Sequence, residues 1–578
     1  MRAVRFVLAV PHRQSPHVPC HIEDAQRPGD VCGRSPRLWA GEGVPQIDFG
    51  SAGRAVGVAF ARDTARRCFA APAGAPANGR ANAFARWILG TYWGAYIAIL
   101  TCEATRGIHV LVDPSGLLPV YRTDTRSHAL LASHPELLAK ALGQPLEICW
   151  TALRVHLERP ELRRRATCLL GVSEVPPGML VPLGVPERPS QPIWRPEDFL
   201  PQGAASFDDA ADELGGLAAG VIGAWAGCLG PVSVAASGGV DSSFICAALA
   251  RGGHDFACVT LRTADPSGDE SAFVRTLANH LGAAFHSKVY DPKQIDPRRS
   301  ASAGLPRPSR RFLLSAVDAG LLDAAAGAGS STVFDGNGGD NLFCFLHSAA
   351  PVVDHLFSQG PRKAVRGTLL DMCRVTDCDL ATMVRAVVRR LVRPTRGFHW
   401  PVDPRLLTLA PAQCDHIEPL SPWLDVDVGR HYGKRDHFGL IMRAQNHVHG
   451  LGAGGLPRFS PLMSQPLLEF CLGVPTWLWC RGGLNRALAR AAFGTDLPPN
   501  IVQRTSKAGP DSMIRQAFEI NRPLIRELLM GGLLAEHGLL DLDAIEKALQ
   551  VDAFCGDSIV YRLLDLAEAE AWARWWTG

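Results

Sequence analysis

One short segment constrains the fold of this chain more than any other. The apolar run Val232–Ala236 leads directly into Ser237-Gly-Gly-Val-Asp-Ser-Ser243, and the apolar residues that follow have helical spacing. Two glycines after a strand let the backbone turn tightly and approach an anion closely. The first N–H groups of the next helix then face that anion. The pattern predicts a strand–loop–helix unit whose loop binds phosphate.

The residues inside this loop narrow the choice of ligand. The loop lacks the Gly-x-x-x-x-Gly-Lys-Ser/Thr pattern of P-loops, but Ser237, Ser242 and Ser243 supply hydroxyl donors. Asp241 would repel a bare phosphate. Its presence makes sense if it holds a Mg²⁺ that the phosphates share.

The two parts of the chain differ in their patterns. Up to about residue 185, short strands are separated by Gly and Pro, which predicts a sheet-rich part. After residue 202, helices alternate with short strands, which predicts an α/β part with a parallel sheet. The helices are expected at 208–228, 270–283 and 312–327, and the strands at 232–236, 257–261 and 332–334. From about residue 350 the pattern is almost entirely helical, and we expect two domains, 1–200 and 201–578.

A second glycine-rich turn supports the first. The strand Thr332–Phe334 leads into Asp335-Gly-Asn-Gly-Gly-Asp340, about 100 residues after the first loop. Ligands of open parallel sheets bind at the carboxyl ends of the strands, so we expect both turns at one edge. The first loop resembles the S-G-G-x-D-S-S loop of the ATP-pyrophosphatase superfamily, and the second turn resembles the S-G-E-G-S-D-E-x-F motif of asparagine synthetases.

This resemblance implies an ATP site and a magnesium site. It implies that Asp241 and Asp340 hold Mg²⁺, and that Val259 lies against the adenine. The residues implied to bind ATP or its pyrophosphate are Ala236, Ser237, Gly238, Gly239, Asp241, Ser242, Ser243, Val259, Asp335 and Gly336.

A late segment, Leu497-Pro-Pro-Asn-Ile-Val-Gln-Arg-Thr-Ser-Lys-Ala-Gly509, resembles the L-P-x-x-(I/V)-x-x-R-x-K segment of the same family, with one extra residue before the Lys. The resemblance implies that Lys507 is catalytic and neutralises charge on the acyl-adenylate and the tetrahedral intermediate. Lys507 is one of only seven Lys among 59 basic residues. A solvated loop is the alternative.

The first 200 residues resemble the glutaminase domain of this family without its nucleophile. The similarity lies in residues 90–121, which include Asp113-Pro-Ser-Gly-Leu-Leu-Pro-Val-Tyr121. A working domain begins Met-Cys-Gly, but here Arg2 takes the place of Cys, and the first Cys is Cys20. Since the thiolate is the nucleophile, we expect a degenerate Ntn-type β-rich sandwich and no use of glutamine.

The position of Asn337 also departs from the family. Asparagine synthetases have Glu there and β-lactam synthetases Tyr, and that residue pairs with a downstream acid to deprotonate the incoming amine. Asp436 and His437 are the candidates for the acid partner, and a solvated helix face is the alternative. The segment Gln445-Asn-His-Val-His449 suggests either a metal site or buried, capping histidines.

The closest resemblance is to lasso peptide cyclases, which also lack the nucleophilic Cys. It implies that a substrate carboxylate is adenylated by ATP and joined to the substrate's own amine, giving a macrolactam between the N-terminus and an Asp or Glu side chain. The implied partners are the precursor peptide, a leader-binding protein and a leader peptidase. The alternatives are an ammonia-dependent asparagine synthetase, a β-lactam synthetase-like cyclase and a non-catalytic scaffold.

Composition limits the other partners. A net charge of +3 gives no reason to expect nucleic acid or an anionic membrane as partner. Leu214–Val240 is uncharged, but the six glycines from Gly215 to Gly230 and then Pro231 argue against a membrane span. The scattered cysteines and the lack of a signal peptide favour a cytoplasmic protein.

Overall fold

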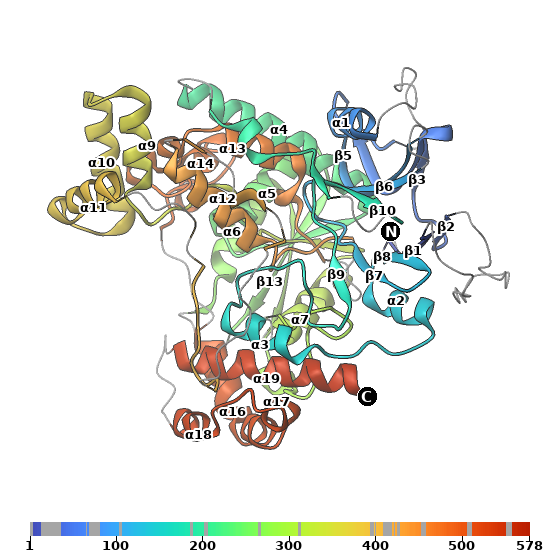
Figure 1. Cartoon of the computed structure of the whole chain (residues 1–578). Helices are drawn as coiled ribbons and strands as arrows, with labels where there is room; N and C mark the ends of the chain where they lie inside the picture. The colour runs from blue at the N-terminus through green and yellow to red at the C-terminus, as the bar shows by residue number, and fades with distance from the viewer. Residues whose placement is uncertain are drawn as a thin grey trace.

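The computed structural model places antiparallel sheets in the first part of the chain and a parallel sheet with many helices in the second (Figure 1). This confirms the predicted fold class. The structure describes all residues except 1–3, 13–35, 65, 69–80, 103–106, 185–188, 202–205, 264–267, 310–313, 394–397, 399, 409–418, 421, 425–427, 430, 452–457, 506–510 and 551–557, and the side chains of 314, 315, 511 and 512.

Two antiparallel sheets form the first part, in the strand orders β2-β1-β8-β7-β9 and β11-β10-β6-β5-β4-β3. The strands are β1 (Phe6–Pro11), β2 (Arg37–Ala40), β3 (Gln46–Asp48), β4 (Gly53–Ala61), β5 (Tyr92–Cys102), β6 (Gly107–Val112), β7 (Tyr121–Asp124), β8 (His128–Ala132), β9 (Val172–Glu174), β10 (Met179–Leu183) and β11 (Gln191–Pro192). The helices are α1 (Ala81–Thr91), α2 (Pro135–Leu142) and α3 (Trp150–Glu158). The strands β5 and β8 are buried along almost their whole length, as expected for strands covered on both faces.

The parallel sheet has the strand order β14-β13-β12-β15-β16. Its strands are β12 (Val232–Ala235), β13 (Phe256–Arg262), β14 (Ala284–Val289), β15 (Thr332–Phe334) and β16 (Arg458–Phe459). The chain proceeds from β12 to β14 in one direction and then returns to β15 on the other side of β12. The order therefore reverses between β12 and β15, which is where such sheets bind ligands.

The helices of the second part follow the predicted ranges where the sequence pattern was clear. They are α4 (Phe207–Leu229), α5 (Val240–Arg251), α6 (Ser271–Leu281), α7 (Leu314–Gly327), α8 (Gly339–Leu342), α9 (Ala350–Gln359), α10 (Lys363–Thr376), α11 (Leu380–Val392), α12 (Tyr432–Ala444), α13 (Gln465–Gly473), α14 (Ala487–Ala492), α15 (Pro499–Val502), α16 (Asp511–Met530), α17 (Leu533–Glu536), α18 (Leu542–Leu549) and α19 (Ser558–Thr577). In Figure 1, α9–α11 project at one end of the molecule and α16–α19 lie at another. The strand β16 falls in the stretch expected to be helical, because two residues are too few to show a strand period.

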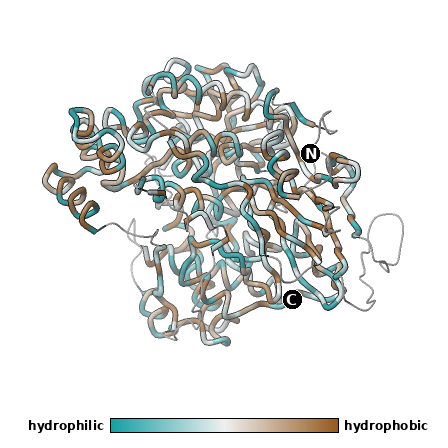
Figure 2. The backbone as a smooth tube through the Cα atoms, turned by 45° about the horizontal axis from the view of Figure 1, so that its top comes forward, coloured by the Kyte–Doolittle hydropathy of each residue, from teal (hydrophilic) through white to brown (hydrophobic). Residues whose placement is uncertain are grey.

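One hydrophobic core continues from the sandwich into the parallel-sheet part. The indole of Trp225 on α4 meets Phe60 of β4 at a centroid distance of 4.8 Å and Phe459 of β16 at 4.4 Å. Figure 2 shows hydrophobic residues concentrated along the central strands and mixed with polar ones on the outer helices. The antiparallel ladders end at Pro192 and α4 begins at Phe207, and the domain boundary near residue 200 stays a prediction. None of the described helices is long and apolar enough to cross a membrane.

Candidate active site

The first loop leaves the parallel sheet at the end of β12. Ala236 N–H donates to the Val259 carbonyl at 2.9 Å, so these two predicted ATP residues are neighbours. Gly238 has a φ of +64°, and a Cβ there would lie 2.6 Å from the Cβ of Phe273. This position therefore requires glycine both for its conformation and for space.

Hydroxyl groups hold the loop in shape. Ser237 N–H donates to Ser242 Oγ at 3.1 Å, and Gly239 N–H donates to Ser237 Oγ at 3.3 Å. Ser243 is completely buried. The predicted serines therefore lie in one compact turn at the start of α5, where the helix N-terminus favours an anion.

The second turn lies directly against the first. A Cβ at Gly339 would be 2.5 Å from Asp241 Cγ, and a Cβ at Gly336 would be 3.0 Å from Asp241 Cβ. These glycines let Asp241 approach the backbone of the turn that follows β15. The structure thus brings the two predicted motifs together at the point where the strand order reverses.

Asp241 and Asp340 converge on one cationic group. Arg486 Nη1 lies 2.9 Å from Asp241 Oδ2 and also donates to Asp340 Oδ1. Arg486 precedes α14 and has a φ of +54°, which few non-glycine residues adopt. Its role was not predicted, because the contact joins residues 245 positions apart in the chain.

The arrangement of the two aspartates fits a divalent cation. Their carboxylates face a shared position that a positive group already contacts, and carboxylate oxygens are preferred ligands of Mg²⁺. Within the described residues, no cluster of three or more His, Cys, Asp or Glu side chains could hold a metal ion. Two protein carboxylates completed by phosphate oxygens is the usual arrangement for Mg²⁺ with a nucleotide.

Asp335 is held inside the protein. Its carboxylate accepts from Ser460 Oγ at 2.7 Å, pairs with His449 Nδ1 at 2.8 Å and with Arg458 Nη2 at 3.2 Å. Burial favours its neutral form, but the ion pairs and hydrogen bonds outweigh burial and lower the pKa of Asp335 to about 2. The described contacts of this carboxylate are internal, and its predicted role beside the nucleotide stays a prediction.

The same network contains Asn337 and His449. The amide of Asn337 donates to the His447 carbonyl at 3.0 Å and lies 3.4 Å from His449 Nδ1. The segment 445–449 thus places a buried histidine against Asp335, which agrees with the buried alternative for this segment. The only signal in the sequence was the unexplained His-x-His pair.

The two candidates for the acid partner, Asp436 and His437, lie on α12. The contacts described here join them to residues other than Asn337. Asp436 pairs with Arg390 at 2.5 Å, and burial raises the pKa of Asp436. His437 is completely buried, so the alternative of a solvated helix face is wrong for it. Its Nε2 lies 2.8 Å from the Leu342 carbonyl, and burial together with nearby Lys434 lowers the pKa of His437 to about 3. It is therefore neutral at physiological pH.

The late motif reaches the first loop through its arginine. Arg504 donates to the Ser237 carbonyl at 2.8 Å and pairs with Glu270 at 2.6 Å, and its guanidinium lies 3.9 Å from the centre of the Phe273 ring. Arg504, which lies far from this loop in the sequence, therefore fixes the position of the loop Ser237–Ser243. Lys507 lies outside the described residues.

One comparison with known proteins identifies the family of the chain. A family model described as asparagine synthase matches residues 229–574, which is more than half of the chain. Among solved structures, the chain is similar to glutamine phosphoribosylpyrophosphate amidotransferase from B. subtilis complexed with ADP and GMP, with 11% identity over 58% of this chain and 84% of that chain and a TM-score of 0.21. No curated protein matches the chain. The chain belongs to the asparagine synthase family and is an ATP-dependent carbon–nitrogen ligase that releases AMP and pyrophosphate.

Proposed function

We propose that this ligase is a lasso peptide cyclase, which activates an Asp or Glu side chain of a precursor peptide and joins it to the peptide's own N-terminal amine. One observation carries the proposal. Asp241 and Asp340 meet at one guanidinium, that of Arg486, at the reversal point of the sheet, and the resemblance to lasso peptide cyclases supplies a peptide as the substrate. The resemblance implies that glutamine is not used, so we take the substrate itself as the source of the amine.

The first step of the proposed reaction forms the acyl-adenylate. An oxygen of the substrate carboxylate bonds to the α-phosphorus of ATP, the bond to the β-phosphate oxygen breaks, and pyrophosphate leaves against the loop Ser237–Ser243. Mg²⁺ held by Asp241 and Asp340 would neutralise charge on the phosphates. The protein contributes mainly by positioning and by electrostatic stabilisation.

The second step forms the amide. The unprotonated amine attacks the acyl carbon, the carbon–oxygen bond to AMP breaks, and the amine gives up a proton. Lys507 would neutralise the negative charge on the intermediate, as the resemblance implies. We propose a leader-binding protein and a leader peptidase as partners. The amine that reacts would be the N-terminal amine of the core peptide, which becomes free only after the leader segment in front of it is cleaved off.

Pyrophosphate release measured with ATP, Mg²⁺ and candidate precursor peptides tests the proposal. We expect release only with the peptide, and a product lighter than the peptide by one water. The variant Asp241→Asn should lower pyrophosphate release by about 10²–10³-fold, because it removes one of the two carboxylates that would hold Mg²⁺ against the phosphates. Asp323→Asn is a matched control, since Asp323 is exposed and forms its ion pair, within the described part of the chain, with exposed Lys288.

Two further outcomes separate the alternatives. Formation of asparagine from Asp, ATP and ammonium would contradict a cyclase and support an ammonia-dependent asparagine synthetase, while cyclisation of a small amino acid without peptide would support a β-lactam synthetase-like enzyme. We expect Lys507→Arg to bind ATP normally and lose ring closure. Full activity of Lys507→Arg would mean that charge alone suffices at this position.

A further inference from the structure

A pocket lies between the antiparallel sheets and the ligase part of the chain. Tyr121, His134 and Arg163 contribute to its lining from the first part, and Arg307 and His449 contribute from the second. The first part therefore supplies much of the wall of a cavity that the ligase part completes. The pocket residues from the first part of the chain have no role in the two glycine-rich loops assigned to ATP.

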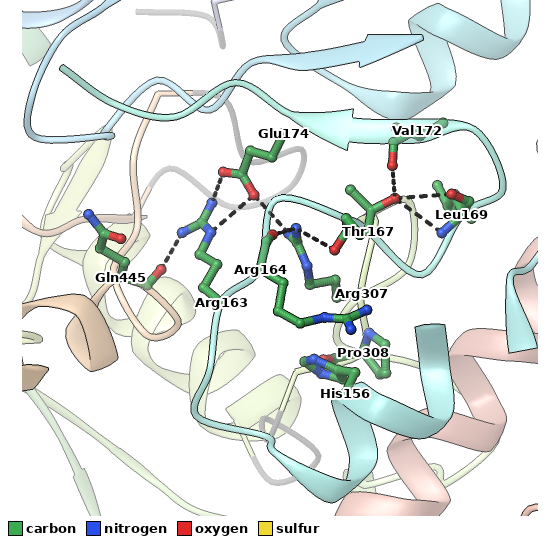
Figure 3. Close-up of polar contacts among 11 residues, drawn as sticks. His156, Arg163, Arg164, Thr167, Leu169, Val172, Glu174, Arg307, Pro308 and Gln445 are labelled. Carbon is green, nitrogen blue, oxygen red and sulfur yellow. Dashed lines mark hydrogen bonds and ion pairs between the residues drawn. The ribbon is translucent and has the colours of Figure 1, made fainter. Parts of the chain in front are cut away.

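The wall of this pocket has more positive than negative charge. Arg163 Nε lies 3.1 Å from Glu174 Oε2, and Arg307 Nη1 lies 2.8 Å from the same oxygen (Figure 3). Burial opposes ionisation of Glu174, but the two arginines outweigh it and lower the pKa of this carboxyl. Two guanidinium groups thus share one carboxylate, although buried charges are normally balanced by partners.

The arginines are fixed in place by backbone carbonyls. Arg163 also donates to the Gln445 carbonyl, and Arg307 donates to the carbonyls of Arg164 and Ala166. Figure 3 shows Arg163 and Arg307 reaching Glu174 from opposite sides. The side chains are therefore oriented before any ligand arrives, which lowers the entropy cost of binding.

Two histidines of the pocket wall, His134 and His156, are neutral. One of them has a ring nitrogen to which no hydrogen-bond partner is assigned among the described residues. Burial lowers the pKa of His134 and of His156 to about 4, so both rings are neutral at physiological pH. His134 Nδ1 lies 2.9 Å from Ser133 Oγ, and its buried Nε2 has no hydrogen-bond partner among the residues that the structure describes. A buried polar atom of this kind is normally paired, and it belongs to a residue of the pocket wall.

Some residues of the pocket wall also contact the second glycine-rich turn. His449 lines the pocket and pairs with Asp335, and the Asn337 amide donates to the carbonyl of His447, which also lines it. The next residue after Asp335 is Gly336, which lies against Asp241. Two residues of the pocket wall, His447 and His449, therefore contact residues of the second glycine-rich turn directly.

We propose that this pocket binds a carboxylate-bearing stretch of the acyl-donor substrate, and that the first part of the chain serves as the wall of the substrate site. The excess guanidinium charge matches a carboxylate, and planar guanidinium groups bind carboxylates with defined geometry. The assignment rests on the proposed function in that it takes a peptide carboxylate as the ligand.

Direct binding tests this assignment without any chemistry. The probe is N-acetyl-glutamate N-methylamide, titrated calorimetrically into the full chain without ATP, and the comparison ligand is the neutral N-acetyl-glutamine N-methylamide. We expect saturable binding of the acid and binding of the amide that is weaker by about 10-fold or more. Equal affinity for the two probes, or no binding of the acid, would overturn the assignment.

Variants locate the binding. Arg307→Met should weaken binding of the acid probe by about 10-fold, and Arg163 remains to balance Glu174. Arg298→Gln is the matched control, because Arg298 lies in the same segment, is exposed, and pairs with Asp296. An unchanged affinity in a folded Arg307→Met protein would contradict the proposal.

A second variant covers the case in which Arg307→Met does not fold. His134→Phe keeps a ring of similar size and removes Nε2, and it should weaken the acid probe by about 3-fold, so unchanged affinity would again contradict the proposal. Failure of the proposed function is distinguishable. A protein that binds the acid probe but releases no pyrophosphate with precursor peptides would keep the pocket assignment and reject the cyclase.

Discussion

The turns after β6 and after β15 have the same local design in two different parts of the molecule. The first is Asp113-Pro-Ser-Gly116 in the sandwich, and the second is Asp335-Gly-Asn-Gly338 in the parallel sheet. Each aspartate is buried and accepts the N–H of the residue two positions later, Ser115 at 3.0 Å and Asn337 at 3.1 Å. Each turn ends on a glycine with positive φ.

The surroundings give these two carboxyls opposite properties. Asp113 receives hydrogen bonds from neutral groups, including Tyr96 N–H at 3.1 Å, and burial raises the pKa of Asp113 to about 7. Asp335 faces His449 and Arg458, which lower its pKa to about 2 despite burial. Cationic side chains from distant segments, rather than the turn itself, decide whether a buried aspartate carries charge.

The largest difference is expected when each aspartate is neutralised. Asp335→Asn should lower the free energy of unfolding by about 3–5 kcal/mol, because it leaves two cationic partners without their counter-charge. Asp113→Asn should lower the free energy of unfolding by a smaller amount, about 1–3 kcal/mol, because Tyr96 N–H and Ser115 N–H bond to different oxygens of Asp113 and Asn can accept only one of them. Urea unfolding at pH 7 measures both, and equal losses would break the comparison.

The local elements of both parts were predictable from the sequence, because they depend on short patterns. The strand–loop–helix around Ser237–Ser243 and the strand Thr332–Phe334 have the expected positions, and the sheet brings their loops together as expected. Strand order in an α/β sheet follows general rules. This is why the meeting of the two glycine-rich turns could be predicted without a structure.

The partners of the site residues were not predictable from the sequence. Arg486 reaches Asp241 across 245 positions, and His449 reaches Asp335 across 114. No periodicity or motif specifies such pairs, because packing of separate segments creates them. The same holds for β16, whose two residues supply Arg458 to Asp335.

The pH dependence of stability should differ in sign between the two aspartates. The folded-state pKa of Asp113 lies above its usual value of about 4, so the folded protein holds the proton longer than the unfolded one. Stability should therefore fall as pH rises from about 4 to about 7, by at most about 4 kcal/mol. Thermal unfolding of wild type and Asp113→Asn across this window measures the effect, and a slope that survives the substitution would assign it to another group.

Asp335 should produce the opposite trend at lower pH. Its folded-state pKa is about 2, below the usual value, so its contribution is complete above pH 4 and is lost as pH falls toward 2. The expected loss is about 2 kcal/mol. The acid limb of an unfolding curve should be shallower in Asp335→Asn than in wild type, and identical limbs would show that the ion pairs do not hold this carboxyl ionised.

The smallest effect is expected from a substitution at the third position of the second turn, one of the two positions at which the turns differ. Asn337→Ser gives the second turn the residue that the first turn has at Ser115. The backbone N–H to Asp335 remains, and the substitution removes the 3.0 Å hydrogen bond from the Asn337 amide to the His447 carbonyl, which is worth about 1 kcal/mol. Urea unfolding should therefore report a loss of about 1 kcal/mol, well below that of Asp335→Asn. A loss as large as that of Asp335→Asn would mean that the Asn337 side chain, and not the charge of Asp335, holds the turn together.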